Sequence, residues 1–177
     1  AGVNPVAWKI SEGHRGKIPW HSIIGSDFSG EIQALGPDVT EFRLGEMVFG
    51  SVGDESGSYA QYALAPVSHI VEKPKTIDHV QAAAMPVPAM TAWQALFDEA
   101  KLTAGQKVLI HAAAGGVGGF AVQLAKWKGA HVIGTASGAN EKLVRSLGAD
   151  EFIDYRTTRF EDVVSEADVV FDTVGGE

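Results

Sequence analysis

The chain has 177 residues, of which 45% are hydrophobic and 20% are charged, a composition typical of a globular protein with one sizeable domain or two small ones. Its formal net charge of −8 and its lack of a basic tract argue against nucleic acid or an anionic membrane surface as the main partner. Cysteine is absent, which excludes disulfides, thiol catalysis and cysteine-ligated zinc. We find neither a membrane span nor a secretory signal, and we expect a cytoplasmic protein.

The first predicted domain covers residues 1–85. This part is rich in glycine and proline, and its apolar residues alternate in short runs, as they do in antiparallel strands. We expect strands within residues 24–36, 42–50, 57–65 and 69–73. Short strands at regular intervals, separated by turn residues, predict a small barrel-like β domain.

The hydrophobic period becomes helical at residues 76–84. The prolines of residues 85–88 (MPVP) interrupt this pattern, and a second helix is expected over residues 89–100. Proline disfavours a continuous helix through such a point. We therefore place the domain boundary here and assign residues 86–177 to the second domain.

From Lys107 onward, strand and helix patterns alternate. The expected strands are residues 107–111, 131–135, 151–154 and 168–174, and the expected helices are residues 117–128, 140–147 and 159–165. Alternating strands and helices predict an α/β domain built on a doubly wound parallel sheet.

The stretch KVLIHAAAGGVGG, residues 107–119, joins a buried strand, a glycine turn and the start of a helix. A glycine-rich motif between a strand and a helix indicates dinucleotide binding. Here Ala113 stands at the place of the first glycine of G-x-G-x-x-G. Glycines let the backbone approach a pyrophosphate, and the first amides of the helix point at that anion. The alternative is an ordinary strand-to-helix turn. The residues expected to bind the cofactor here are Ala114, Gly115, Gly116 and Val117.

Ordered motifs along the whole chain resemble the medium-chain dehydrogenase/reductase superfamily, and in particular its zinc-free quinone oxidoreductase branch. These motifs are residues 4–6 (NPV), 25–30 (GSDFSG), 35–36 (LG), 44–48 (LGEMV), 57–60 (GSYA), 90–92 (MTA), 113–118 (AAGGVG) and 147–150 (LGAD). The resemblance implies a GroES-like β-barrel domain followed by a Rossmann domain, both incomplete in this chain. It also implies a longer physical molecule that forms a homodimer.

Zinc-dependent members of that superfamily use a cysteine and a Gly-His-Glu motif. Here residues 25–27 read Gly-Ser-Asp, and cysteine is absent. The seven-residue separation of His14 and His21 matches no common pattern of metal ligands. We therefore expect no metal site.

The end of the second Rossmann strand decides between NADH and NADPH. An NAD enzyme usually places an acid there to accept from the ribose 2′-hydroxyl, whereas residues 135–138 read TASG and the next carboxylate is Glu141. The resemblance implies that Ser137 and Lys142 bind the 2′-phosphate of NADPH. The alternative is that Ser137 caps the next helix and that Lys142 is a solvated charge.

The resemblance also implies further cofactor contacts. Tyr155 is expected against the adenosine, and Thr91 near the nicotinamide ring and its ribose; packing for Tyr155 and a helix-start hydroxyl for Thr91 are the alternatives. Val174 and Gly175 follow the last strand, at the edge where parallel strands meet a ligand.

Asn4 and Lys9 are the expected catalytic residues. Asn4 matches an asparagine near the reacting centre, and Lys9 matches a family lysine that could neutralise phosphate or polarise a carbonyl. Ala7 stands where the family often has aspartate, which weakens any polar relay through this segment. A solvated role for Lys9 remains open.

These features predict a zinc-independent, NADPH-dependent reductase that transfers hydride to a quinone or an α,β-unsaturated carbonyl compound. Such conjugated acceptors need little electrophilic help, since the incoming charge spreads over their π system. Two alternatives stay open: an NADPH-binding regulatory or structural protein with little turnover, and an enoyl-thioester reductase.

Overall fold

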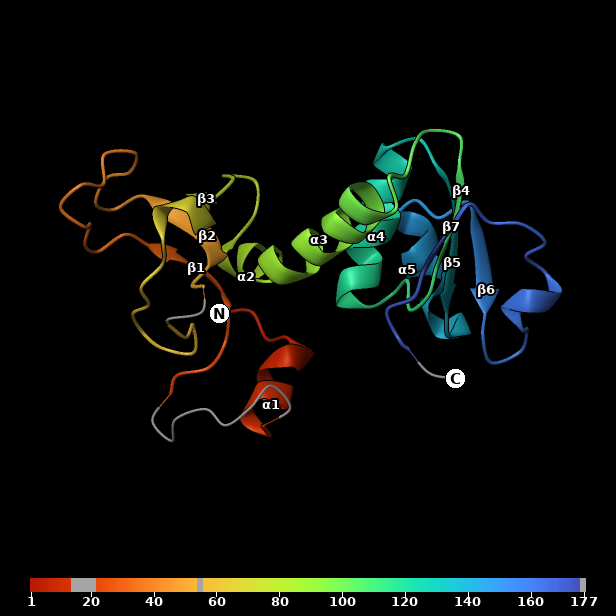
Figure 1. The fold of residues 1–177 in the computed structure, drawn as a ribbon, viewed down its shortest axis with the longest axis horizontal. Helices are drawn as coiled ribbons and strands as arrows, with labels where there is room; N and C mark the ends of the chain where they lie inside the picture. The colour runs from red at the N-terminus through yellow and green to blue at the C-terminus, as the bar shows by residue number, and fades with distance from the viewer. Residues whose placement is uncertain (14–21, 54–55, 176–177) are drawn as a thin grey trace. The chain divides into compact units, whose positions relative to one another are not determined.

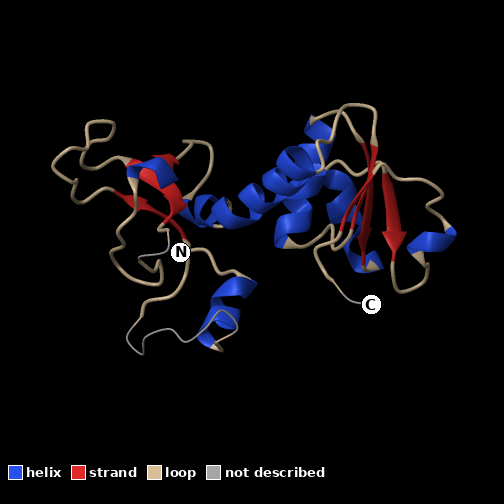
Figure 2. Ribbon diagram, viewed as in Figure 1, coloured by secondary structure: helices blue, strands red, loops and turns tan. Residues whose placement is uncertain are grey.

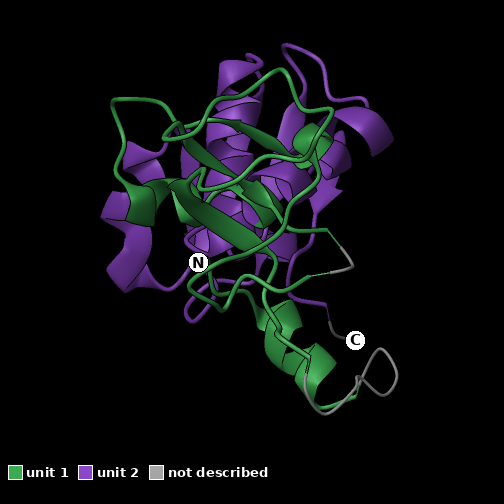
Figure 3. Cartoon of the chain, turned by 90° about the vertical axis from the view of Figure 1, so that its left-hand side faces the viewer, with its two compact units in different colours: residues 1–87 green, residues 88–177 purple. Residues whose placement is uncertain are grey.

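The computed structural model describes residues 1–13, 22–53 and 56–175 of the chain. It divides into two compact units, residues 1–87 and residues 88–177, which are shown in different colours in Figure 3. No helix among the described residues is both long and apolar enough to cross a membrane.

Unit 1 is built on a three-stranded antiparallel sheet in the order β1-β2-β3, with short helices around it (Figure 1). Phe49 lies opposite Ser29 on one side and Val71 on the other. The elements of this unit are α1 (Pro5–Ser11), β1 (Asp27–Glu31), β2 (Met47–Ser51), η1 (Val67–His69), β3 (Ile70–Glu72) and α2 (His79–Ala83).

Two features of unit 1 differ from the sequence prediction. Residues 57–65 are not a strand: within the described part of the chain, only the amides of Ser58 and Tyr59 in this segment find backbone acceptors, at Gly25 and Ile24. The segment that begins at Pro5 forms the helix α1, which the sequence analysis did not anticipate; Asn4 is its N-cap residue and proline opens the helix.

The helix after α2 starts earlier than predicted. α2 is opened by a capping box in which Asp78 and Gln81 satisfy each other's backbone amides. After a turn at residues 84–85, α3 (Pro86–Trp93) begins at the first proline, so the two prolines lie inside its first turn, where proline is tolerated. The chain continues as the π-helical segment η2 (Gln94–Glu99).

Unit 2 contains a four-stranded parallel sheet in the order β6-β5-β4-β7, drawn as arrows in Figure 2. The chain runs from β4 outward to β5 and β6 and then returns to the other side of β4 to form β7. The elements of this unit are β4 (Lys107–Ile110), α4 (Gly116–Trp127), β5 (His131–Ala136), η3 (Gly138–Asn140), α5 (Glu141–Ser146), β6 (Glu151–Asp154), η4 (Phe160–Asp162) and β7 (Val169–Phe171).

Both faces of this sheet are covered, which explains the nearly continuous apolar run of β4. Val108 and Ile110 join the core formed with α4 and α5, whereas Leu109 packs with Ile133 on the face covered by Phe160. The predicted α/β fold with a doubly wound parallel sheet is confirmed. The predicted helix over 159–165 is reduced to the single turn η4, and the predicted strand over 168–174 pairs only over Val169–Phe171.

The strand order reverses between β4 and β7. In open parallel sheets, ligands bind beyond the carboxyl ends of the strands at such a reversal. The glycine turn after β4 and the residues after β7 lie at this edge, which is where the candidate site is built.

Candidate functional site

The glycine turn between β4 and α4 is held by one carbonyl group. Ala112 has a φ of 49° and is in the left-handed region, and its oxygen accepts from the amide of Gly115 at 2.8 Å. A Cβ atom on Gly118 would collide with the same oxygen, so this position requires glycine. Gly115 is the N-cap residue of α4, and Gly116 and Val117 are its first two residues. The predicted turn therefore presents the first amides of a twelve-residue helix at the edge of the sheet.

A hollow of about 240 Å³ lies beside this turn. Its lining residues are Ala112, Ala114, Gly115, Ala136, Ser137, Asn140 and Tyr155. Four residues predicted from the sequence, namely Ala114, Gly115, Ser137 and Tyr155, are thus brought together from the ends of three neighbouring strands. A hollow that combines small residues, polar side chains and an aromatic ring is suited to a ribose and its substituents.

The polar wall of the hollow is formed by Ser137 and Asn140. The side-chain amide of Asn140 donates to the Ser137 hydroxyl oxygen at 3.0 Å. Ser137 is the N-cap residue of η3 by position, but its side chain makes no capping hydrogen bond there. Because its oxygen accepts from Asn140, its own proton is directed elsewhere and can be donated to a ligand. Sequence reasoning missed Asn140, although a Ser-x-x-Asn spacing after a strand is a readable signal.

The aromatic wall is Tyr155, a residue that is 61% exposed. The Arg156 guanidinium carbon lies 5.9 Å from the centre of this ring. A guanidinium over an aromatic face adds positive charge next to the hollow. Sequence reasoning also missed Arg156, which directly follows the predicted tyrosine.

A carboxylate of the neighbouring strand lies beside the loop that follows β5. Asp154 of β6 pairs with Ala136 of β5, the residue before Ser137. A Cβ atom on Gly138 would lie 2.5 Å from the Asp154 Oδ2 atom. β5 itself therefore ends without an acid, but the parallel register of β5 and β6 places Asp154 beside the loop that follows β5.

Six of the predicted cofactor residues do not line the hollow, namely Thr91, Gly116, Val117, Lys142, Val174 and Gly175. Lys142 is exposed on the first turn of α5, two residues beyond Asn140. Thr91 is exposed on α3, three residues before the π-helical segment η2 begins.

The chain after β7 turns sharply at the strand-order reversal. Asp172 accepts from the amides of Val174 at 2.8 Å and Gly175 at 3.2 Å, and these two hydrogen bonds lower the pKa of Asp172. The Thr173 hydroxyl donates to the carbonyl oxygen of His111 at 3.1 Å, which joins this turn to the end of β4. The predicted residues Val174 and Gly175 thus lie beyond the end of β7, with their amides bound to Asp172.

The predicted catalytic residues lie in unit 1. Asn4 is half-buried and donates from Nδ2 to the Asp27 carboxylate at 2.8 Å. Lys9 is exposed on α1, with its Nζ atom 5.8 Å from the centre of the Trp8 ring. Asp27, which sequence reasoning quoted only as part of a motif, is 0% exposed. The sequence could have identified Asp27 by its position, which is that of the glutamate in the Gly-His-Glu motif.

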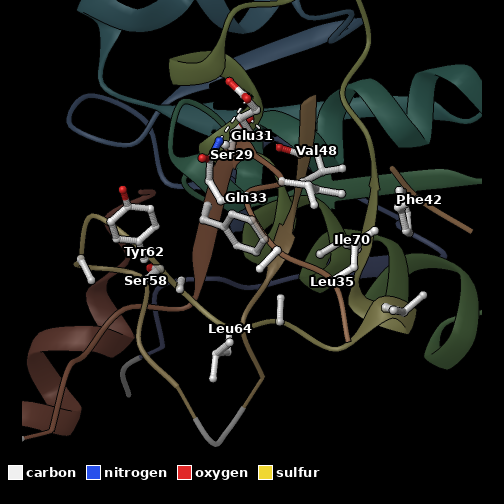
Figure 4. A pocket seen from close by; sticks show the side chains of 18 of the residues that line it. Ser29, Glu31, Gln33, Leu35, Phe42, Val48, Ser58, Tyr62, Leu64 and Ile70 are labelled. Carbon is white, nitrogen blue, oxygen red and sulfur yellow. Dashed lines mark hydrogen bonds between the residues drawn. The ribbon is translucent and has the colours of Figure 1, made fainter. Parts of the chain in front are cut away.

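Unit 1 also contains a larger hollow of about 810 Å³, seen from close by in Figure 4. Apolar side chains that line it include Phe42, Leu64 and Ile70, and polar ones include Gln33 and Tyr62. None of the predicted catalytic or cofactor residues belongs to its lining.

Within residues 1–13, 22–53 and 56–175, no three His, Asp or Glu side chains are grouped so that they could hold a metal ion. His14 and His21, which the sequence analysis weighed as metal ligands, lie outside the described residues.

Two family models match the chain: "Alcohol dehydrogenase GroES-like domain" over residues 1–75 and "Zinc-binding dehydrogenase" over residues 116–177. A chloroplastic quinone-oxidoreductase homolog from Spinacia oleracea is 38% identical, over 98% of this chain and 56% of that protein. A trans-enoyl reductase from Aspergillus terreus is 36% identical, over 99% of this chain and 53% of that protein. The structure of the quinone oxidoreductase from Coxiella burnetii is 39% identical, with a TM-score of 0.88, over 99% of this chain and 58% of that one.

The chain thus spans about half the length of the curated relatives it matches. The first family model confirms the predicted GroES-like character of the N-terminal part, which the three-stranded sheet alone does not establish. The similarity to solved structures extends over both units.

Proposed function

We propose, because this chain belongs to the medium-chain dehydrogenase/reductase superfamily, that the whole protein transfers hydride from NADPH to a quinone or an α,β-unsaturated carbonyl compound. The observation that carries this proposal is the hollow at the carboxyl edge of the parallel sheet, where the glycine turn, Ser137 and Tyr155 meet. Relatives named quinone oxidoreductase support the acceptor class.

The residues at this hollow fit a nicotinamide dinucleotide. The first four residues of α4 are Gly-Val-Gly-Gly, so no acidic side chain stands in front of the helix amides and the dipole can act on a pyrophosphate. Ser137 has a proton to donate to a 2′-phosphate, and the exposed ring of Tyr155 offers a flat apolar surface to the adenosine. We assign the phosphate cation to Lys142, which is within one helical turn of Asn140.

Bound NADPH would supply the hydride, and the protein would orient the two reactants and exclude water. We assign Thr91, Val174 and Gly175 to the nicotinamide end, and Asn4 and Lys9 to the acceptor. A conjugated acceptor spreads the incoming charge over its own π system, which suits a site without an obvious general acid.

We propose a zinc-independent reaction on the chemistry of the residues present. The chain contains no cysteine, and Ser26 stands at the place of the histidine ligand of zinc-dependent relatives. Asp27, at the place of the glutamate, is fully buried and already accepts hydrogen bonds from Asn4 and from the amide of Val87.

The first test is a titration of the full-length protein with NADPH and with NADH. We expect tighter binding of NADPH, and a loss of that preference by about tenfold when Ser137 and Lys142 are both changed to alanine, since a charge-assisted hydrogen bond to phosphate contributes about 1.5–3 kcal/mol. Glu161→Gln on the exposed turn η4 is the matched control, because that side chain lines neither hollow. Equal affinity of the parent protein for both cofactors would contradict the phosphate assignment.

Reduction of an enoyl thioester is the second candidate, favoured by the similarity to a protein named trans-enoyl reductase. Steady-state oxidation of NADPH with a small quinone, a simple enone and an enoyl thioester distinguishes the two. Faster turnover of the thioester by at least tenfold in kcat/KM would favour the second candidate. Tight NADPH binding without oxidation by any acceptor would favour a regulatory or structural role.

We also propose that the full-length protein is a homodimer with a cytoplasmic location. Size-exclusion chromatography with light scattering, and imaging of the tagged full-length protein, test these two predictions. The spinach relative is named as a chloroplastic protein, so an organelle is the outcome that would contradict the second.

A further inference from the structure

A carboxylate without a cation partner is buried in unit 1. Asp27 opens β1 and is 0% exposed, and among the described residues it forms no ion pair. Burial raises the pKa of Asp27, although hydrogen bonds from Asn4 and Val87 act in the opposite direction. A buried ionisable group is costly to a fold unless its position serves a purpose or its hydrogen bonds compensate.

Asp27 fixes the N-terminal segment in two ways. Its carbonyl oxygen accepts from the amide of Gly2 at 2.9 Å, and its Oδ2 atom accepts from Asn4 Nδ2 at 2.8 Å. Gly2 packs so closely that a Cβ atom there would lie 2.9 Å from Asp27 Cβ. Because the carboxylate can only accept, it holds the NH2 group of Asn4 and leaves the carboxamide oxygen turned away from it.

The same carboxylate receives the start of α3. Both of its oxygens lie 3.2 Å from the amide of Val87. Pro86 and Pro88 have no N–H group, so Val87 carries the only amide donor among the first three residues of this helix. Asp27 thus caps from a distant strand a helix that also carries Thr91, one turn further along.

We propose that Asp27 is a positioning residue of unit 1: its carboxylate orients the Asn4 carboxamide and fixes the first turn of α3. This inference rests on the proposed function, because that function assigns Asn4 to the acceptor. Asp27 itself touches neither reactant; it acts through the two groups that donate to it.

The test is a double-mutant cycle on the full-length protein, with NADPH and a small quinone as substrates. We expect Asp27→Ala to lower kcat by about tenfold or more while the Kd for NADPH, measured by titration, changes by less than about twofold. Asn4→Ala is expected to lower kcat as well. The double variant should be no more than about twofold slower than Asn4→Ala, because the two residues act as one unit.

Asp27→Asn is the conservative variant, since it retains one acceptor oxygen for Asn4 and Val87, and we expect it to recover most of the lost kcat. Asp78→Asn is the matched control: Asp78 is also a helix-capping aspartate, but it is exposed and caps α2 through Gln81. Its kcat and Kd should equal those of the parent protein. If Asp27→Ala is not folded at the assay temperature, Asp27→Ser, which keeps a shorter acceptor, replaces it with the same expected fall in kcat.

The outcomes separate this inference from the proposed function. A parent protein that does not oxidise NADPH with any quinone overturns the proposed function, and the role of Asp27 falls with it. An active parent whose Asp27→Ala variant keeps its kcat overturns the role of Asp27 alone. Losses that multiply in the double variant, or an Asp27→Asn variant as slow as Asp27→Ala, also overturn it.

Discussion

Asp154 is the residue at which sequence and structure disagree most about cofactor choice. The end of β5 carries no acid, which favours a 2′-phosphate, yet the parallel pairing of Ala136 with Asp154 brings a carboxylate beside the Ser137 loop. A carboxylate repels a phosphate, whereas it can accept from a ribose hydroxyl. The proposed NADPH preference therefore has to overcome one unfavourable charge at this point.

Changing Asp154 to asparagine should strengthen NADPH binding. We expect the Kd for NADPH to fall about threefold to tenfold and the Kd for NADH to change less than twofold, because only the 2′-phosphate senses the removed charge; a partly exposed charge pair contributes about 1 kcal/mol. Titration of the full-length variant with both cofactors measures this. Asp162→Asn, which removes an exposed charge on η4, should leave both values unchanged. Equal changes for both cofactors would show that Asp154 does not face the 2′-position.

The residues that sequence reasoning missed share one physical cause. Asn140 lines the hollow from a turn of 3-10 helix, Asp154 is placed beside the same loop by strand pairing, and Arg156 lies near the Tyr155 ring. The motif of the glycine turn contains none of these features. Ala114, Gly115, Ser137 and Tyr155 could be predicted because a fixed order of strand, turn and helix places them at one edge of the sheet.

Among the elements, the parallel strands were predicted best. β4 and β6 agree with the expected ranges to within one residue, because buried parallel strands are marked by short apolar runs and are bounded by turn residues. Strands of unit 1 were harder. Residues 57–65 alternate as a strand does, but a strand needs a partner as well as a pattern, and the partner is a property of the whole sheet.

The start of α4 offers a matched pair of glycine substitutions. Gly118→Ala should destabilise the protein by about 2 kcal/mol or more and weaken NADPH binding at least tenfold, because its methyl group would meet the backbone oxygen of Ala112. Gly119→Ala, one residue further along the same helix, would place its Cβ atom 3.5 Å from the Leu147 Cδ1 atom, an ordinary contact. We expect this variant to be neutral or to gain up to about 1 kcal/mol from helix propensity.

Thermal unfolding and NADPH titration of the two variants, each in the full-length protein, measure this contrast. Similar behaviour of Gly118→Ala and Gly119→Ala would mean that the Ala112 carbonyl can move aside. The glycine turn would then be less rigid than its hydrogen bond to Gly115 indicates.

Two carboxylates, one in each unit, should give the free energy of unfolding opposite dependences on pH. Partial desolvation opposes ionisation of Asp150, but hydrogen bonds from Lys126 and from the amide of Val132 prevail and lower its pKa. Burial, in contrast, raises the pKa of Asp27. A lowered folded-state pKa stabilises the fold above the ordinary aspartate range, and this contribution is lost as pH falls through that pKa. A raised folded-state pKa destabilises the fold, and this destabilisation grows as pH rises from the ordinary aspartate pKa to the raised pKa.

Asparagine at each position separates the two contributions. At pH 7, Asp150→Asn should lower the free energy of unfolding by about 1 kcal/mol, the usual net contribution of a charged hydrogen bond at a partly exposed site, and the difference from the parent should vanish in acid as Asp150 becomes protonated. For Asp27→Asn we expect the opposite trend: the free energy of unfolding of the variant, relative to that of the parent, should increase as pH rises above the ordinary aspartate range. Chemical unfolding of the full-length parent and both variants between about pH 3 and pH 7 measures these trends. Parallel trends for the two variants would show that burial does not dominate the pKa of Asp27.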